Sequence, residues 1–257
     1  WNGSGWTEAG DLNTGRNSLS SAGTTTAGLV FSGVVSTGES ATNESWNGSA
    51  WTEVADLNTA RNNGTGGGIS TSAILAGGLT TNPLAITETW NGSSWTEVSD
   101  LNSARSQTGG TAQNNTDAIV FGGRTPPGGD TVNTESWDGS SWTEVSDLAT
   151  ARDQFQGSGA SNTSALAFGG STPPYTNATE EWSFSGINPA TTPAADYSDA
   201  IVGQMYYNST AGQFKAIKSG GAPLGTWSSG ADLNTARKGS MGFGVLTANI
   251  VAGGNNP

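Results

Sequence analysis

A phrase of sixteen residues recurs along the chain at nearly constant intervals, and this repetition restricts the possible folds more than any other feature. The phrase reads WNGSSWTEVSDLNSAR at 90–105, and its first tryptophans are spaced 44 to 47 residues apart. Copies begin at Trp1, Trp46 and Trp137, and a broken copy begins at Trp182. Self-similarity at such a period is typical of structural units that cannot bury an apolar face alone. We therefore predict five units that pack on one another.

Each unit contains two signals for β-structure. The first is a short apolar run stopped by glycine, which predicts a buried strand. These runs are GLVFSG, SAILAGG, AIVFGG, ALAFGG and NIVAGG. The second signal is the phrase itself, because Asn-Gly or Asp-Gly between two tryptophans predicts a hairpin. Two strands precede each hairpin and two form it, and four short antiparallel strands in every unit predict the blade of a β-propeller.

The order of these landmarks resembles the kelch repeat. An arginine is followed by an apolar strand, Gly-Gly, a glutamate before the tryptophan pair, and Asp-Leu, over about 215 of the 257 residues. Common kelch units often have Tyr where Trp stands here, and kelch propellers more often have more blades. Together with the five copies, the resemblance implies one all-β, kelch-like propeller over 1–257, with four antiparallel strands per blade. The expected blades are about 16–57, 61–101, 105–148, 152–233, and 237–257 with 1–12, so the two terminal segments share a blade and close the ring.

The composition excludes several classes of function. The chain has 9 basic and 21 acidic residues, a net charge of −12, and neither His nor Cys. Such an acidic chain disfavours nucleic acids and anionic membrane surfaces, which attract basic proteins. Without His and Cys, an imidazole general base, a thiolate nucleophile and most zinc or copper sites are excluded, whereas Asp/Glu chemistry stays open. No apolar run reaches the roughly 20 residues of a membrane-spanning helix. We therefore expect no catalytic residue, metal, cofactor or membrane insertion.

The symmetry of the hairpins places two glutamates opposite each other in three of the units. Directly opposed like charges destabilise a sheet, so a cation should lie between them, and the nearest repeated cation is the arginine that ends each phrase. Opposed carboxylates also occur in glycosidases and calcium sites, but an active site is rarely needed five times. We therefore predict one structural clasp per blade. Its residues are Arg16, Arg61, Arg105, Arg152 and Arg237 with Glu44, Glu53, Glu88, Glu97, Glu135 and Glu144.

Two further repeated residue types also fit a role in the fold. The aspartates that help to hold the turns between blades are Asp11, Asp56, Asp100, Asp147 and Asp232. All ten tryptophans lie at repeated positions, where their large aromatic area suits the packing of one blade on the next. Stacking on sugars is the alternative for a tryptophan that proves to be exposed.

The connections after Gly-Gly differ most between units, and variable loops on a repeated scaffold are where binding usually occurs. They read VVSTGESATN, LTTNPLAIT, RTPPGGDTVNT and STPPYTNAT. The antiparallel strand order places them on the same face as the DLNTAR turns. Candidate binding residues in these connections are Arg124, Asp130 and Tyr175.

About 40 extra residues lie inside the fourth unit, between its two tryptophans. We expect a small β-insertion at 187–224, with two strands around an Asn-Ser-Thr-Ala-Gly turn. Its candidate binding residues are Tyr197, Tyr206, Tyr207, Phe214, Lys215 and Lys218. GQMYYNSTAGQFKAIK, followed by GTWSS, resembles a short module of tail-fibre and other virion proteins of bacteriophages. A small hairpin that merely packs on the propeller is the alternative.

The resemblance to virion proteins implies a location on a virion surface or outside the cell. We expect a non-enzymatic tail-fibre or decoration protein whose partners are other virion proteins or a glycan or receptor on a host surface. A secreted bacterial propeller for carbohydrate binding or adhesion is one alternative, and a carboxylate-dependent enzyme acting on glycans is another. Because the chain opens on Trp1 without Met, we also expect a mature product or an excerpt of a longer protein.

Overall fold

The structure is a computed structural model that describes residues 5–172 and 174–183 and the backbone of five later strands. These later strands are β20 (Met205–Asn208), β21 (Gln213–Ala216), β22 (Thr226–Ser229), β23 (Lys238–Val245) and β24 (Ala248–Asn255). Within the described residues every regular element is a β-strand. Paired strands run antiparallel in each sheet. The predicted all-β class is therefore confirmed.

Four sheets contain four strands each, and the strand order in each sheet follows the chain from one edge to the other. The first blade consists of β1 (Ser20–Thr24), β2 (Ala27–Phe31), β5 (Asn43–Trp46) and β6 (Trp51–Val54). The second consists of β7 (Thr65–Ile69), β8 (Ser72–Ala76), β9 (Thr87–Trp90) and β10 (Trp95–Val98). The third consists of β11 (Gly109–Asn114), β12 (Asp117–Phe121), β15 (Thr134–Trp137) and β16 (Trp142–Val145). The fourth consists of β17 (Gln156–Ser161), β18 (Ser164–Phe168), β19 (Thr179–Ser183) and β22.

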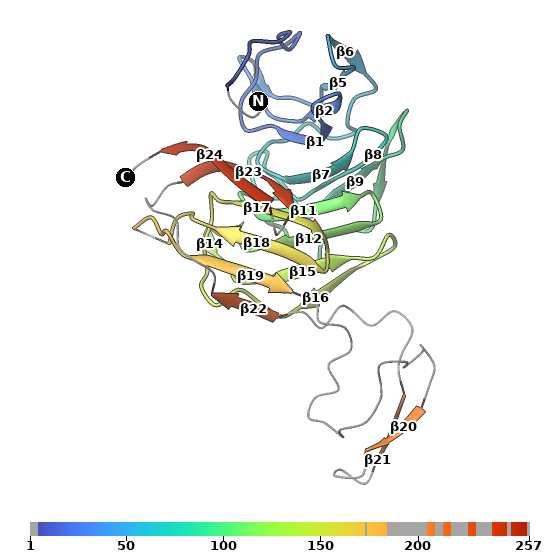
Figure 1. The fold of residues 1–257 in the computed structure, drawn as a ribbon, viewed down its shortest axis with the longest axis vertical. Helices are drawn as coiled ribbons and strands as arrows, with labels where there is room; N and C mark the ends of the chain where they lie inside the picture. Colours follow the sequence, from blue (N-terminus) through green and yellow to red (C-terminus); the bar gives the residue numbers. More distant parts are fainter. Residues whose placement is uncertain are drawn as a thin grey trace.

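The first strands of successive blades lie side by side. β1 contacts β7, β7 contacts β11, β11 contacts β17, and β17 contacts β23. Figure 1 shows the blades following one another from the blue N-terminal sheet to the orange strand β19, with β23 and β24 in red beside β17. Four-stranded sheets that meet along their first strands form a β-propeller-like arrangement.

The outer hairpins have the register that the spacing of the tryptophans predicts. Trp46 lies opposite Trp51 in the first blade, and the second and third blades repeat this pairing. In the fourth blade Trp182 lies opposite Trp227, at the two ends of the insertion. The glutamates two residues before and after the tryptophan pairs also lie opposite each other in the first three blades.

The turn between the two tryptophans is held by its own side chains. In the second blade Asn91 Oδ1 accepts hydrogen bonds from the backbone N of Ser93 and Ser94, at 2.9 and 3.0 Å. Gly92 has a φ of 97°, a conformation that glycine adopts without steric cost. The Asn-Gly-Ser sequence therefore fixes the hairpin locally, before any packing between blades.

Apolar side chains gather between the blades, with one cluster at each of the three described interfaces. The first cluster joins Leu29 and Phe31 of β2 to Trp90 and Trp95 of the second blade, and Leu57 from the intervening turn packs with them. The other two clusters repeat this arrangement between the second and third blades and between the third and fourth. Among the described side chains, the core therefore lies between blades.

The second strand of a blade is buried on both faces. Ile74 and Leu75 are neighbours in β8, but Leu75 packs toward the first blade and Ile74 toward the third. Side chains alternate between the two faces of a strand. This explains why the second strands read as continuous apolar runs in the sequence.

The first strands carry glycine where two blades approach most closely. A Cβ atom on Gly157 of β17 would lie 2.5 Å from Cζ of Phe121 and 2.6 Å from the backbone N of Gly110 in β11. A Cβ atom on Gly110 would lie 2.5 Å from the side chain of Thr65 in β7. The neighbouring first strands therefore leave no room for a side chain at these positions.

The substitution Gly157→Ala should lower the free energy of unfolding by about 1–3 kcal/mol, the usual cost of overpacking a tight site. The matched control is Gly15→Ala, because a Cβ atom there has nothing within 4 Å. The four other phrases carry alanine at that place, Ala60, Ala104, Ala151 and Ala236. The control should change stability by less than about 0.5 kcal/mol. Urea unfolding of both variants measures the difference, and equal stabilities would contradict the close approach of the strands.

A further sheet begins after the fourth blade. β23 and β24 pair antiparallel, and β24 contains the fifth apolar run, NIVAGG. In the described residues this sheet has two strands, residues 5–12 form no strand, and Trp6 is 74% exposed. The predicted pairing of residues 1–12 beside β24 is therefore not seen among the described residues, which do not include Trp1–Ser4.

The insertion contains a hairpin. β20 and β21 pair antiparallel, with Asn208 opposite Gln213, so both strands predicted around the turn are present. Figure 1 shows this hairpin away from the four blades. The rest of the predicted insertion at 187–224 lies outside the described residues.

Candidate functional site

The arginine that ends each phrase is buried against a glutamate of the blade that follows. Arg61 pairs with Glu88 of β9, and both side chains are fully buried. Asn58 donates to the same carboxylate from its backbone N at 2.7 Å and from its side-chain amide at 2.8 Å. Nε of Arg61 donates to the carbonyl of Gly77 at 3.0 Å. Both oxygens of the Glu88 carboxylate therefore have hydrogen-bond donors.

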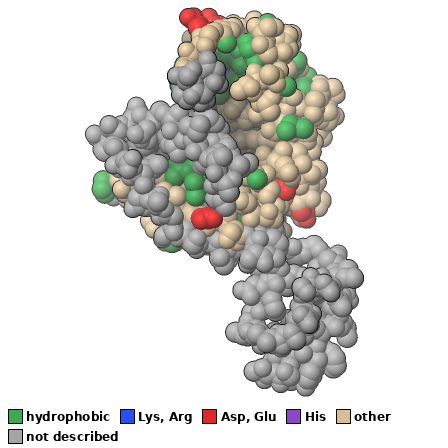
Figure 2. Space-filling model, in the orientation of Figure 1, with side chains coloured by type: hydrophobic (Ala, Val, Ile, Leu, Met, Phe, Trp, Pro, Cys, Tyr) green, Lys and Arg blue, Asp and Glu red, His purple; other side chains and the backbone are tan. Residues whose placement is uncertain are grey.

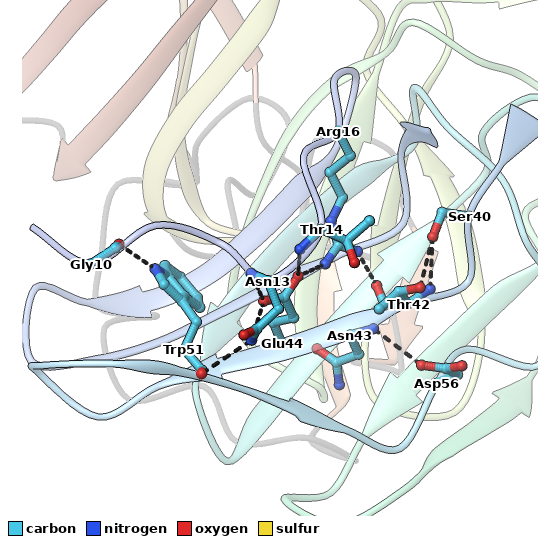
Figure 3. Close-up of polar contacts among 10 residues, drawn as sticks. All are labelled: Gly10, Asn13, Thr14, Arg16, Ser40, Thr42, Asn43, Glu44, Trp51 and Asp56. Carbon is cyan, nitrogen blue, oxygen red and sulfur yellow. Dashed lines mark hydrogen bonds and ion pairs between the residues drawn. The ribbon is translucent and has the colours of Figure 1, made fainter. Parts of the chain in front are cut away.

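The same arrangement, which we call the clasp, occurs in each phrase whose arginine the structure describes. The pairs are Arg16 with Glu44, Arg61 with Glu88, Arg105 with Glu135, and Arg152 with Glu180. Figure 3 shows the first, in which Asn13, Thr14 and Arg16 donate to the carboxylate of Glu44. The carbonyl of Arg61 also accepts a hydrogen bond of 2.9 Å from Gly33 in the preceding blade. The arginine therefore ties together two blades and the turn between them.

The structure brings together only part of the predicted clasp. Glu53, Glu97 and Glu144 lie opposite the clasp glutamates, but their side chains are exposed and none forms an ion pair among the described side chains. Among the described side chains, each clasp arginine therefore pairs with the glutamate of the third strand alone, and the carboxylate on the outermost strand is exposed to solvent, which weakens its interactions. Glu180, which the sequence analysis did not assign, is the clasp glutamate of the fourth blade. Arg237 lies outside the described residues.

The first clasp lowers the pKa of Glu44. Burial raises the pKa of this carboxyl group, but hydrogen bonds from Asn13 and Arg16 and the charge of Arg16 lower it by more. The ionised carboxylate is therefore favoured in the folded chain.

Acid should weaken this clasp. The pKa of Glu44 in the folded chain lies below its ordinary value of 4.5. The ionised carboxylate therefore stabilises the fold fully above pH 4.5, and this contribution is lost as the pH falls through the folded pKa. We expect the difference in unfolding free energy between the wild type and Glu44→Gln to shrink between about pH 7 and about pH 3. Urea unfolding at several pH values measures it. A difference that stays constant over this range would contradict the prediction.

The remaining residues of the phrase also serve the fold. Oδ1 of Asp100 accepts a hydrogen bond of 3.3 Å from the backbone N of Thr87, and Leu101 N donates to the carbonyl of Ala85 at 3.0 Å. Leu101 is buried in the cluster between the second and third blades. Asp56 and Asp147 accept the equivalent bonds in their own blades. The repeated phrase is therefore scaffold along its length.

The variable connections lie beside the turns between blades. Two of them form small hairpins, β3 (Val34–Val35) with β4 (Gly38–Glu39) and β13 (Arg124–Thr125) with β14 (Gly129–Asp130). Each connection begins with an isolated bridge to the residue that follows a clasp arginine. These bridges are Asn17 to Val34, Asn62 to Leu79, Ser106 to Arg124, and Asp153 to Ser171.

A cleft of about 290 Å³ opens where the connections of the second and third blades meet. We call it the loop cleft. Residues from three segments line it, 79–83, 106–107 and 124–128. Asn82, Gln107 and Arg124 contribute polar side chains, and Pro126 and Pro127 contribute apolar surface. Its volume lies at the lower end of the range for small-molecule sites.

The three candidate residues of the connections do not form one site. Arg124 and Asp130 lie opposite each other in the hairpin of β13 and β14, but only Arg124 lines the loop cleft. Tyr175 lies in the connection of the fourth blade, where it pairs with Ser171, and it does not line the cleft. Sequence reasoning missed Asn82 and Gln107, and no feature of composition or spacing distinguishes them.

The candidate residues of the insertion have no described side chains. Tyr206 and Tyr207 lie on β20, and Phe214 and Lys215 lie on β21. Tyr197 and Lys218 lie outside the described residues.

No family model matches the chain, and no curated protein matches it. The resemblances to the kelch repeat and to a bacteriophage module therefore rest on the sequence motifs. In the part of the chain that the structure describes, no helix is long and apolar enough to cross a membrane. The same part contains no group of three or more acidic side chains placed to hold a metal ion.

Proposed function

We propose that the chain is a non-enzymatic, kelch-like propeller of a virion, a tail-fibre or decoration protein that mediates host-surface adhesion or particle assembly. One observation carries this proposal. The four described clasp arginines are bonded to glutamates inside the fold, whereas residues of two variable connections line much of the loop cleft. The chain thus has the organisation of a scaffold that displays variable loops.

The clasp geometry argues against catalysis by the repeated carboxylates. A general acid or base must reach a proton on its substrate. Glu88 is fully buried and bonded to Arg61 and Asn58, and the clasps of the other described blades have the same form. A substrate would have to open the interface between two blades to reach them.

The assignment to a virion rests on the insertion. Its sequence resembles a module of bacteriophage tail-fibre and virion proteins, and β20 and β21 form a hairpin away from the blades. We therefore propose that the insertion is a contact lobe for other virion proteins or for a glycan or receptor on the host. A secreted bacterial adhesion propeller would share the blades and the loop cleft but would have no need of a fibre-like lobe.

We also propose a five-bladed ring, in which residues 1–12 complete a blade with β23 and β24. The segment before β1 docks on the first blade as later phrases dock on theirs, through the clasp of Arg16 and a 3.2 Å bond from Trp51 Nε1 to the carbonyl of Gly10. Trp46 and Trp51 are only partly buried, so this face has room for a covering blade.

Shortening the insertion tests the adhesion function. Because Trp182 and Trp227 pair as the tryptophans of the plain hairpins do, residues 182–227 can be replaced by WNGSSW without changing the register. We expect this variant to melt like the wild type but to lose binding of the labelled chain to bacterial cells, or its assembly into particles.

A second variant distinguishes binding by the insertion from binding by the variable connections. In it, residues 124–130 are replaced by residues 34–39, the corresponding hairpin of the first blade. If only this second variant loses adhesion, the loops rather than the lobe carry binding. If both variants bind and assemble like the wild type, the display function is wrong.

A further inference from the structure

The loop cleft lies beside the one basic side chain that the described part of the chain exposes. Five arginines have described side chains, and four of them are fully buried in clasps. The fifth, Arg124, is 48% exposed. Figure 2 shows that uncharged polar surface and scattered carboxylates cover most of the described residues on one face. An anionic ligand therefore has a single point of attraction on the described surface, and it lies at a cleft.

The guanidinium of Arg124 is held in place, and its described ion pair lies outside hydrogen-bond distance. Its Nε donates to the carbonyl of Gly128 at 2.9 Å, which holds the side chain against its own hairpin. Its nearest carboxylate is Asp153, with 4.0 Å between Nη1 and Oδ2. No hydrogen bond among the described residues engages its two terminal nitrogens. These nitrogens form the planar fork that matches a carboxylate.

Gln107 supplies a second polar group to the cleft. Its Oε1 is buried and has no hydrogen-bond partner among the described residues, although buried polar atoms are normally paired. Its backbone is held with a φ of 55° by a 2.8 Å bond to the carbonyl of Asn63 and a 3.0 Å bond from Gln154 N. The backbone is therefore fixed, and a rotation of the side-chain amide toward the loop cleft, which Gln107 lines, would bring the oxygen to a ligand hydroxyl group.

The rest of the lining is suited to a sugar ring. Pro126, Pro127 and Pro83 present apolar surface, and Asn82 adds an amide at the same cleft. Ligand sites commonly combine apolar walls with a few polar groups that fix orientation. The net charge of −12 opposes anions at long range, but exposed charges are largely screened beyond about 8 Å at physiological ionic strength. Binding of an anion therefore depends on its contact with Arg124.

We propose that the loop cleft binds a carboxylate-bearing sugar, such as a uronic acid unit of a polysaccharide. Arg124 pairs with the carboxylate, Gln107 accepts a hydrogen bond from a ring hydroxyl, and the prolines contact the apolar face of the ring. This inference rests on the display function proposed above and names the ligand class of one of its loops.

Titration of the full 257-residue chain with two disaccharides tests the proposal. The probes are glucuronic acid linked to glucose and its neutral counterpart, cellobiose, with acetate as a third, separate ligand. We expect the acidic disaccharide to bind at least about tenfold more tightly than cellobiose, the factor expected for one charge-assisted hydrogen bond. Acetate should bind more weakly than the acidic disaccharide because it lacks the hydroxyl groups and the ring.

Variants at the cleft assign the contacts. Arg124→Ala should remove the preference for the acidic probe, and Arg124→Lys should keep part of it. Gln107→Leu should weaken both disaccharides without abolishing the preference. Ser171→Ala, at the equivalent place in the next blade, is the matched control and should bind as the wild type does. Thermal melting of each variant establishes that it is folded.

Three outcomes would overturn the proposal: equal affinities for the two disaccharides, a preference that survives Arg124→Ala, or no binding of the acidic probe. Acetate binding as tightly as the acidic disaccharide would make the cleft a simple anion site and would equally overturn the sugar assignment. If the wild-type chain adheres to cells but gives any of these binding results, the display function stands and only this ligand class is removed.

Discussion

Replacing Arg105 with alanine should lower the free energy of unfolding by about 3–5 kcal/mol, the cost of leaving one partner of a buried ion pair alone. The Arg105 side chain is fully buried, and it donates both to Glu135 and to the carbonyl of Asn133, at 2.6 Å to the latter. After the substitution, Glu135 keeps only the donors of Asn102, at 2.7 Å. The charge of the carboxylate then remains buried without its cation.

The control for this prediction lies in the same chain. Arg124→Ala removes an arginine that is 48% exposed and whose carboxylate partner is 4.0 Å away. Asp153 is only 4% exposed, but a half-exposed pair outside hydrogen-bond distance contributes about 1 kcal/mol or less, so this variant should lose clearly less stability than Arg105→Ala. If Arg105→Ala and Arg124→Ala unfold together, the clasp does not stabilise the fold. Ligand affinity of the folded Arg105→Ala fraction should be unchanged, because Arg105 does not line the loop cleft.

The second large effect is expected at a tryptophan. Trp137→Ala should lower the free energy of unfolding by about 3–5 kcal/mol, as is usual for truncating a buried aromatic side chain to alanine. Trp137 is 1% exposed and packs in the cluster between the second and third blades. Its Nε1 also donates to the carbonyl of Asn115 at 3.0 Å. The variant therefore loses both packing and a hydrogen bond.

Two comparisons make the tryptophan prediction specific. Ile69→Ala removes an apolar side chain that is 48% exposed, and it should change stability by less than about 1 kcal/mol. Trp46→Ala tests ring closure, because Trp46 occupies the place of Trp137 in the first blade but is only partly buried in the described residues. A closed ring predicts a loss as large as that of Trp137→Ala. A clearly smaller loss would leave the Trp137 prediction intact and contradict closure.

Most of the blade could be predicted because its determinants are local and repeated. The spacing of Trp90 and Trp95 alone defines the register of their hairpin, and the Gly-stopped apolar runs mark the second strands. Whether a residue is buried could not be predicted in the same way. Glu88 and Glu97 face each other, yet one is buried and the other exposed. The symmetry of the residue numbers about the turn predicts which residues lie opposite each other in the hairpin, whereas their burial depends on the neighbouring blade.

The loop cleft, in contrast, could not be predicted from the repeat. Its lining comes from three segments, 79–83, 106–107 and 124–128, and two of these belong to connections whose sequences differ from unit to unit. Variability between units pointed to Arg124, but Gln107 lies two residues after a clasp arginine, a position that has a positive φ in four units whatever its side chain. Its value as a binding group comes from which loops surround it. Such information exists only in the folded chain.

The clasp has a consequence for how this architecture can change in length. Each interface is heterologous, since an arginine and a turn on one side meet a glutamate and a tryptophan pair on the other. A heterologous interface does not by itself set the number of blades. The rotation from one blade to the next decides whether the array closes into a ring or continues as an open spiral. A duplicated unit of 44 to 47 residues would therefore bring a complete pair of complementary edges with it. Recombination between units can thus add or remove a blade without a new interface having to evolve.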